Sequence, residues 1–159
     1  MKKYILFIII AILLATLCSC TAETDYFGFS KKDFEIIEEA DTHGGFHGDG
    51  AYYLILDCSK NKQKALELIE DWKPLDMTES LELIMYGGEK DGISYDGYDL
   101  SEQAKMPKVE NGYYRFYDRH PNAKDHHGDS ELLKRASFNF SLAVYDTDTD
   151  IMYYFEYDT

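Results

Sequence analysis

The sequence predicts an α+β domain, in which an antiparallel sheet of about four strands is covered on one face by two or three helices. Two observations predict this fold. Apolar residues at helical spacing dominate the first half of the chain, whereas strict alternation of apolar and polar residues dominates its last part. Two alternating segments at the C-terminus predict a β-hairpin as the final unit.

The first helix is expected at residues 31–40. Ser30 is a suitable N-cap, and Phe34 and Ile37 recur at the spacing of one helical face. Four glycines within residues 44–50 then predict a loop of high backbone freedom. The apolar run at residues 51–58 follows and predicts a strand that is covered on both faces.

Two further helices are expected between residues 59 and 88. Ser59 caps the first of them, and Pro74 ends it. Asp76 and Glu79 have capping-box spacing for a third, short helix that ends at two glycines. Residues 89–111 show no clear period, so a long surface loop is expected there, with room for a short irregular strand.

The remaining strands are expected after residue 111. Residues 112–119 form an aromatic-rich strand candidate, and residues 131–135 suggest one helical turn. Residues 137–145 and 151–157 alternate strictly, which predicts an antiparallel hairpin with one buried face. The polar segment at residues 146–150 (DTDTD) connects these two strands.

The N-terminal residues have the pattern of an export signal. Two lysines precede an apolar run at residues 5–14. That run is too short for a bilayer-spanning helix, which needs roughly 20 apolar residues. The tetrapeptide at residues 17–20 (LCSC) resembles the lipobox of bacterial lipoproteins. The resemblance implies that Cys20 carries diacylglycerol and becomes the new N-terminus.

The lipobox resemblance also implies the domain organisation. Residues 1–19 would be a signal peptide that is removed, residues 20–28 a lipidated N-terminus with a short tether, and residues 29–159 one globular domain. The protein would then be anchored by lipid on the extracytoplasmic side of the cell membrane. Cys58 would remain as a single thiol, so no internal disulfide is expected.

A wider resemblance covers most of the mature domain. The segments YYRFYDRH (residues 113–120), RASFNF (135–140), YDT (145–147) and YYF (153–155) are similar to small lipoproteins of the low-GC Gram-positive type, a family of unknown function. This resemblance implies no activity, cofactor or site residue.

The charge of the chain limits its partners. Lysine and arginine number 16 against 30 aspartates and glutamates, and loss of the leader removes two lysines, which leaves 14 basic residues and a net charge of −16. Nucleic-acid binding needs a basic surface, so no nucleic-acid partner is expected. The membrane is expected as a partner through the N-terminal lipid, and an envelope protein or glycan through the domain.

The glycine-rich loop at residues 41–50 is the most distinctive candidate site. It places Asp41, His43, His47 and Asp49 close together in sequence, and such side chains bind transition metals. Their spacing matches no zinc motif. Two interpretations therefore stay open: a metal or substrate site, or a structured turn between two elements. No cofactor is predicted.

Tandem tyrosines are a second candidate feature. In a strand, each pair places one ring on either face. The rings of Tyr52, Tyr114 and Tyr154 are candidates for an exposed aromatic face, which is common at protein and glycan contacts. The alternative is that these rings pack beneath the helices.

Three other patterns are weaker. The aspartates at residues 146–150 begin like a calcium-binding EF-hand loop, but Ile151 and Tyr157 stand where that loop needs glycine and glutamate. Cys58 is either a nucleophile or a small buried hydrophobe. Three later histidines could converge with the first two on one site, namely His120, His126 and His127.

Three functional hypotheses follow. The first is a non-catalytic, lipid-anchored binding or accessory module of the cell envelope. The second is a small metal-assisted envelope enzyme that uses the loop at residues 41–50. The third is a protective protein that binds a basic toxin or peptide through its acidic surface.

Overall fold

The computed structural model describes residues 27–44 and 48–159, and it confirms an α+β fold with an antiparallel sheet. The chain divides into two compact units, Met1–Ser30 and Lys31–Thr159, and all elements named below belong to the second. The predicted signal peptide, Cys20 and His47 lie outside the described residues. Among the described helices, none is long and apolar enough to cross a bilayer.

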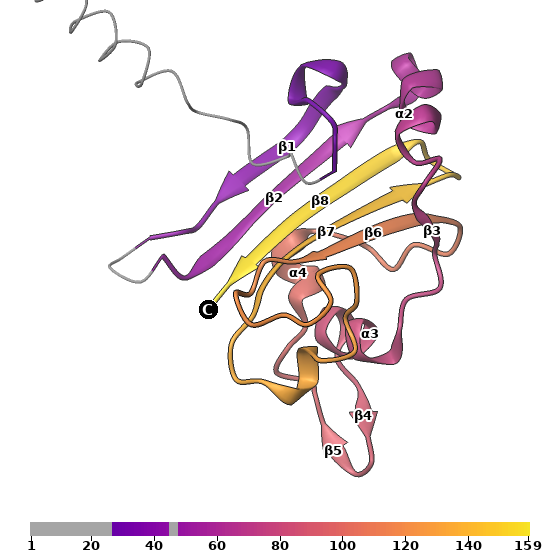
Figure 1. The fold of residues 1–159 in the computed structure, drawn as a ribbon. Coiled ribbons are helices and arrows are strands. Elements are labelled where there is room, and N and C mark those ends of the chain that lie inside the picture. The colour runs from indigo at the N-terminus through magenta and orange to yellow at the C-terminus, as the bar shows by residue number, and fades with distance from the viewer. Residues whose placement is uncertain (1–26, 45–47) are drawn as a thin grey trace, which may run out of the picture. The chain divides into compact units, whose positions relative to one another are not determined.

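Six strands form the main sheet, in the order β1-β2-β8-β7-β6-β3 (Figure 1). The sheet is larger than the predicted four strands, because β1 and the two-residue β3 extend its edges. The C-terminal strand β8 lies between β2 and β7, so it occupies a central position. The strands of this sheet are β1 (Glu35–Asp41), β2 (Gly50–Asp57), β3 (Lys73–Pro74), β6 (Gly112–Asp118), β7 (Asn139–Asp146) and β8 (Ile151–Asp158).

The predicted helix at residues 31–40 is wrong. A 3-10 turn, η2 (Lys31–Asp33), is followed by β1, which pairs with β2 and carries a bulge between Ile36 and Glu38. As an edge strand, β1 leaves Ile36 and Ile37 45% and 54% exposed. Pairing with the open edge of β2 satisfies the main-chain groups of this segment, and this outweighs its weak helical pattern.

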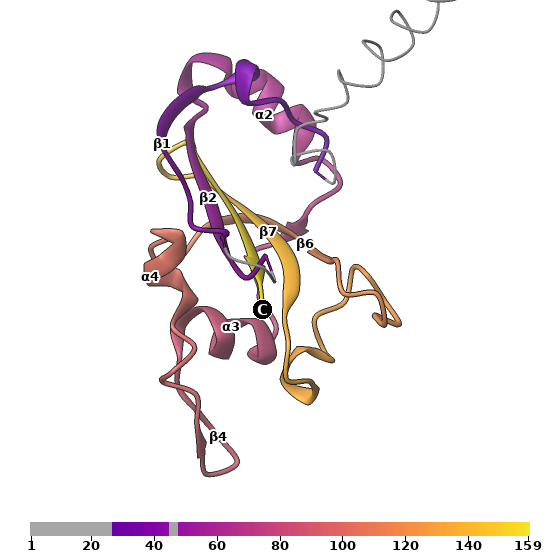
Figure 2. The same cartoon turned by 90° about the vertical axis from the view of Figure 1, so that its left-hand side faces the viewer.

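The helices lie on both sides of the sheet, which corrects the prediction of one covered face. Figure 2 shows α3 (Glu79–Tyr86) and α4 (Leu100–Ala104) on one side and α2 (Lys62–Leu68) on the other. The C-terminal hairpin is therefore buried on both faces as well. Its neighbouring residues Leu142 and Ala143 point to opposite faces, and both are fully buried.

Residues 89–111 contain more structure than the predicted surface loop. A small hairpin forms from β4 (Glu89–Lys90) and β5 (Ile93–Ser94), and α4 follows it. Leu100 and Ala104 of α4 join the main hydrophobic core, where they meet side chains from α3 and the sheet. Helix α3 begins after Thr78, whose hydroxyl accepts a hydrogen bond from the Leu81 N–H at 3.4 Å, rather than after Asp76.

Candidate functional site

The glycine-rich loop begins where the ladder between β1 and β2 ends. Thr42 extends the pairing: its main-chain N–H and its hydroxyl donate to the Ala51 carbonyl oxygen at 2.8 and 3.0 Å. Gly50 is required at this point, because a Cβ there would lie 2.5 Å from the Cα of His43. The close approach of the two strand ends fixes the start of the loop and places His43 beside the end of β8.

His43 bridges two carboxylates. Its Nδ1 lies 2.7 Å from Asp41 Oδ1, and its Nε2 lies 3.1 Å from Asp158 Oδ2. The two ring nitrogens point in different directions, so these carboxylates do not converge on one ion beside His43. Among the residues that the structure describes, no group of three or more His, Cys, Asp or Glu side chains could hold a metal ion. Asp49 is exposed.

Asp158 connects His43 to an ionic network at the end of the sheet. Arg119 donates through Nη2 to Asp158 Oδ2 at 2.9 Å, and the Asn139 side-chain amide donates to Asp158 Oδ1 at 2.9 Å. Glu156 is 5% exposed, and its Oε2 lies 3.8 Å from the same guanidinium. The network joins β7, β8 and the start of the loop, and this indicates a structural role for the histidine that the sequence marked as a candidate ligand.

The candidate tyrosines do not form an exposed face. Tyr52 and Tyr114 are each 3% exposed, and Tyr154 is fully buried. The rings of Tyr52 and Tyr154 pack edge to face, with their centroids 6.0 Å apart. Burial raises the pKa of Tyr52 to about 12, and its hydroxyl donates to Glu39 at 2.9 Å. Of the two interpretations of these rings, packing beneath the covering elements agrees with the structure, because both faces of the sheet are covered.

Cys58 is a buried thiol at the end of β2. The residue is 0% exposed, and burial raises the pKa of the thiol to about 12. Since the thiolate is the reactive form of cysteine, this environment is unsuited to a nucleophile.

We expect Cys58 to react slowly in the folded protein. In the variant Cys18→Ser/Cys20→Ala, it is the single thiol of the chain. Alkylation by iodoacetamide at pH 8 should be at least ~100-fold slower in buffer than in concentrated urea, because reaction requires opening of the fold. As a control, Lys60→Cys in the same variant with Cys58→Ala added should react equally fast in buffer and in urea. Equal rates for Cys58 in buffer and urea would contradict its burial.

The aspartates of the C-terminal hairpin stabilise the turn itself. Asp146 accepts hydrogen bonds from the Asp148 N–H and the Thr149 hydroxyl at 2.8 and 2.7 Å. Asp150 accepts from the Tyr145 hydroxyl at 2.7 Å. These carboxylates stabilise the hairpin turn through hydrogen bonds. Their pattern departs from the EF-hand loop at Ile151 and Tyr157.

Asp118 and Arg135 form a buried, bidentate ion pair at the end of β6. The Arg135 nitrogens Nη1 and Nη2 donate to Asp118 Oδ2 and Oδ1 at 2.7 and 2.8 Å. Asp118 is 2% exposed, and its Oδ1 also accepts from the His120 N–H at 3.0 Å. The ion pair therefore holds η4 (Leu132–Lys134), which directly precedes Arg135, and the loop at residues 119–129 against the sheet.

The three later histidines do not converge. His126 stacks on the Tyr117 ring with centroids 5.5 Å apart, and His127 meets the same ring edge-on at 5.4 Å. His120 lies apart from them, where its Nδ1 accepts from the Asn122 N–H at 3.2 Å. In a neutral ring, this bond places the proton on Nε2, and Ser137 Oγ lies 3.4 Å from that nitrogen as its acceptor.

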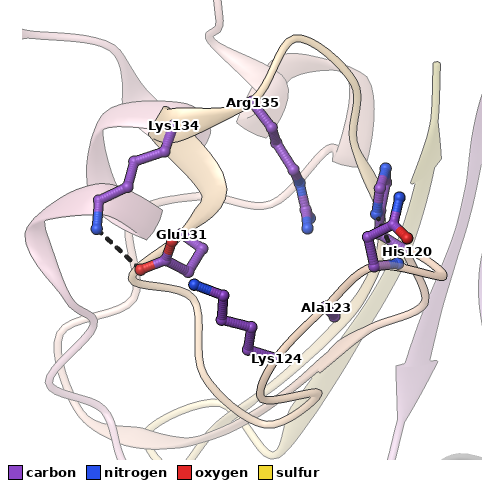
Figure 3. A pocket seen from close by; sticks show the side chains of 7 residues that line it. His120, Ala123, Lys124, Glu131, Lys134 and Arg135 are labelled. Carbon is purple, nitrogen blue, oxygen red and sulfur yellow. Dashed lines mark hydrogen bonds and ion pairs between the residues drawn. The ribbon is translucent and has the colours of Figure 1, made fainter.

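A pocket of about 290 Å³ lies between the loop at residues 119–129 and η4 (Figure 3). Figure 3 shows the Arg135 side chain extending into the space between the two segments, and the Lys124 side chain ending beside Glu131. The carboxylate of Glu131 is paired with Lys134 Nζ at 2.8 Å. The pocket is lined by His120, Asn122, Ala123, Lys124, Glu131, Lys134 and Arg135.

Sequence reasoning did not find this pocket. Its lysines come from two segments of ordinary polar composition, and nothing in either segment indicates the other. One signal was available, namely the scarcity of arginine, which occurs three times in the chain. Each arginine forms an ion pair with an aspartate: Arg115 with Asp71, Arg119 with Asp158, and Arg135 with Asp118.

The fold and the site define a class: an α+β domain in which a buried ion pair braces a polar pocket at one end of β6. No protein family model matches the sequence, and comparisons with curated proteins and with solved structures found no significant match. The candidate site is therefore argued from the geometry of this chain alone.

Proposed function

We propose that the protein is a lipid-anchored component of the cell envelope, and that its folded domain is a non-catalytic binding or accessory module. The observation that carries the anchor is the lipobox-like tetrapeptide at residues 17–20, which follows an apolar run too short to span a bilayer. Diacylglycerol on Cys20 supplies two acyl chains, enough for a stable anchor, whereas a single chain binds marginally.

The side-chain geometry supports binding rather than catalysis. Both ring nitrogens of His43 are engaged by carboxylates, and the Cys58 thiol is buried with a raised pKa. By contrast, the pocket beside η4 is lined by the exposed lysines Lys124 and Lys134. These observations favour a module that meets an envelope protein or glycan over an enzyme that uses either candidate nucleophile or base.

The charge of the chain favours a second candidate function. A net charge of −14 suits a protective protein that binds a basic toxin or peptide. The salt dependence of partner binding distinguishes the two functions, because salt screens the attraction between exposed charges on which capture of a basic peptide depends. Capture of a basic peptide that disappears at high salt would support the protective function.

Labelling with palmitate tests the anchor. We expect labelled palmitate to enter the wild-type protein in growing bacteria and to be absent from Cys20→Ala, because the thiol of Cys20 is the attachment point. Cys58→Ala is the matched control, and it should keep the full label. Equal label in wild type and Cys20→Ala, or no label in the wild type, would contradict the proposal.

A further inference from the structure

We propose that the pocket between the loop at residues 119–129 and η4 binds a small phosphate ester through Lys124 and Lys134. This inference rests on the binding role proposed above, and it names the site and the chemical class of the ligand. It is argued from charge, from hydrogen-bond donors and from size.

The pocket is a cationic site on an acidic chain. Two lysines line it against one glutamate, and the third cation, Arg135, is paired with Asp118, whereas acidic residues outnumber basic ones 30 to 16 in the whole chain. Hydrogen bonding to Lys134 is the main cause of the lowered pKa of Glu131, and the charge of Lys124 lowers it further. Both ammonium groups are therefore near enough to Glu131 to stabilise its negative charge, and an anionic group bound beside them would be stabilised in the same way.

The available donors suit phosphate better than carboxylate. An arginine fork is the side chain that matches a carboxylate in two parallel hydrogen bonds. Here both Nη groups of Arg135 are engaged by Asp118, so this residue forms a wall of the site. The Nε2 of His120 is also engaged, because Ser137 Oγ lies 3.4 Å away. What remains are the compact ammonium groups of Lys124 and Lys134. Donors from separate directions fit the several oxygens of a tetrahedral phosphate.

The size of the pocket indicates an ester rather than the bare ion. Its volume of about 290 Å³ is close to the lower end of ligand pockets, which begin near ~300 Å³. A water molecule takes roughly 30 Å³. On that scale the pocket has room for more heavy atoms than the five of a phosphate ion, so a small organic group can be bound with it. The net charge of −14 opposes approach to a surface of anionic lipid. The phosphate source is therefore a soluble ester and not a lipid headgroup.

Calorimetric titration of the full chain in a non-ionic detergent tests the site. We expect saturable binding of glycerol 3-phosphate, weaker binding of inorganic phosphate, and no binding of glycerol. Vesicles of phosphatidylglycerol in place of the soluble ester should produce no saturable signal in excess of phosphatidylcholine vesicles. Binding to the anionic vesicles alone would overturn the soluble source, and equal binding of glycerol and glycerol 3-phosphate would overturn phosphate recognition.

Matched lysine variants locate the binding. Lys124→Gln and Lys134→Gln should each weaken glycerol 3-phosphate binding about tenfold, as expected for loss of a hydrogen bond between charged groups. Lys60→Gln makes the same change in net charge at an exposed lysine outside the pocket, with 76% of its side chain accessible, and should bind like the wild type. Unchanged binding in the two pocket variants, or an equal loss in Lys60→Gln, would overturn the site. Palmitate labelling is independent of these titrations, so failure of the pocket and failure of the anchor are distinguishable.

Discussion

Replacing Arg135 by alanine is expected to lower the free energy of unfolding by about 3–5 kcal/mol, because the variant leaves the Asp118 carboxylate buried without its partner. Asp118 is 2% exposed and shares two hydrogen bonds of 2.7 and 2.8 Å with the guanidinium. The same loss should free the loop at residues 119–129. Urea unfolding followed by circular dichroism measures the change.

Two further variants test whether the loss of stability in Arg135→Ala comes from the buried, unpaired carboxylate or from the mere loss of an arginine. Arg115→Ala removes a guanidinium from β6, the strand that carries Asp118, but its partner Asp71 has a side chain that is 67% exposed, so the loss should stay below about 1 kcal/mol. The paired replacement Asp118→Leu with Arg135→Met should be more stable than Arg135→Ala alone, because no unpaired charge is then buried. Similar losses for Arg115→Ala and Arg135→Ala would contradict the role of the buried pair.

Replacing Phe140 by alanine should cost about 3–5 kcal/mol, as for other large-to-small changes in well-packed cores. Phe140 is the second residue of the interior strand β7, and it is fully buried. Its ring contacts three others with centroids 5.5 to 6.2 Å away, so truncation leaves a cavity that its neighbours cannot easily fill. These rings belong to Phe116, Phe155 and Tyr157.

An exposed residue provides the control for the core variant. Ile93 in β5 is 57% exposed, and Ile93→Ala should change stability by less than about 0.5 kcal/mol. If Phe140→Ala does not fold, Phe140→Leu supplies a milder truncation that should still be less stable than Ile93→Ala. A loss for Phe140→Leu no larger than that for Ile93→Ala would place Phe140 outside the core.

The elements that sequence reasoning found are those with strong local patterns. The C-terminal hairpin alternates with period two over both strands, and its polar DTDTD connection satisfies its own turn. The register of β7 and β8 runs without interruption from Asn139↔Asp158 to Asp146↔Ile151. A pattern this regular requires no information from distant residues, so one sequence is enough to predict the pairing.

The missed elements depend on partners that are distant in sequence. In residues 31–40, Phe34 and Ile37 fit a helical face, but the open edge of β2 decides the conformation of this segment. In α4, Leu100 and Ala104 are one helical turn apart, which was a usable signal within a stretch dotted with glycine and charge. Whether the tyrosine rings are exposed could not be predicted from the sequence either, because it depends on which elements cover each face of the sheet.

The candidate site was harder to predict than the fold. Asp41 and His43 are neighbours in sequence and contact each other, but Asp158, which completes their network, lies 115 residues after His43. Among 30 acidic residues, nothing local marks Asp118 as the partner of Arg135. The pocket forms where two polar segments meet, and this requires the folded chain.

The intact mass of the protein extracted from bacterial membranes tests the central claim of a lipid-anchored module most directly. The account predicts a chain that begins at Cys20 and is heavier than residues 20–159 by at least a diacylglycerol group, with the added mass confined to the N-terminal peptide. A chain that retains residues 1–19, or one whose mass equals that of unmodified residues 20–159, would contradict it.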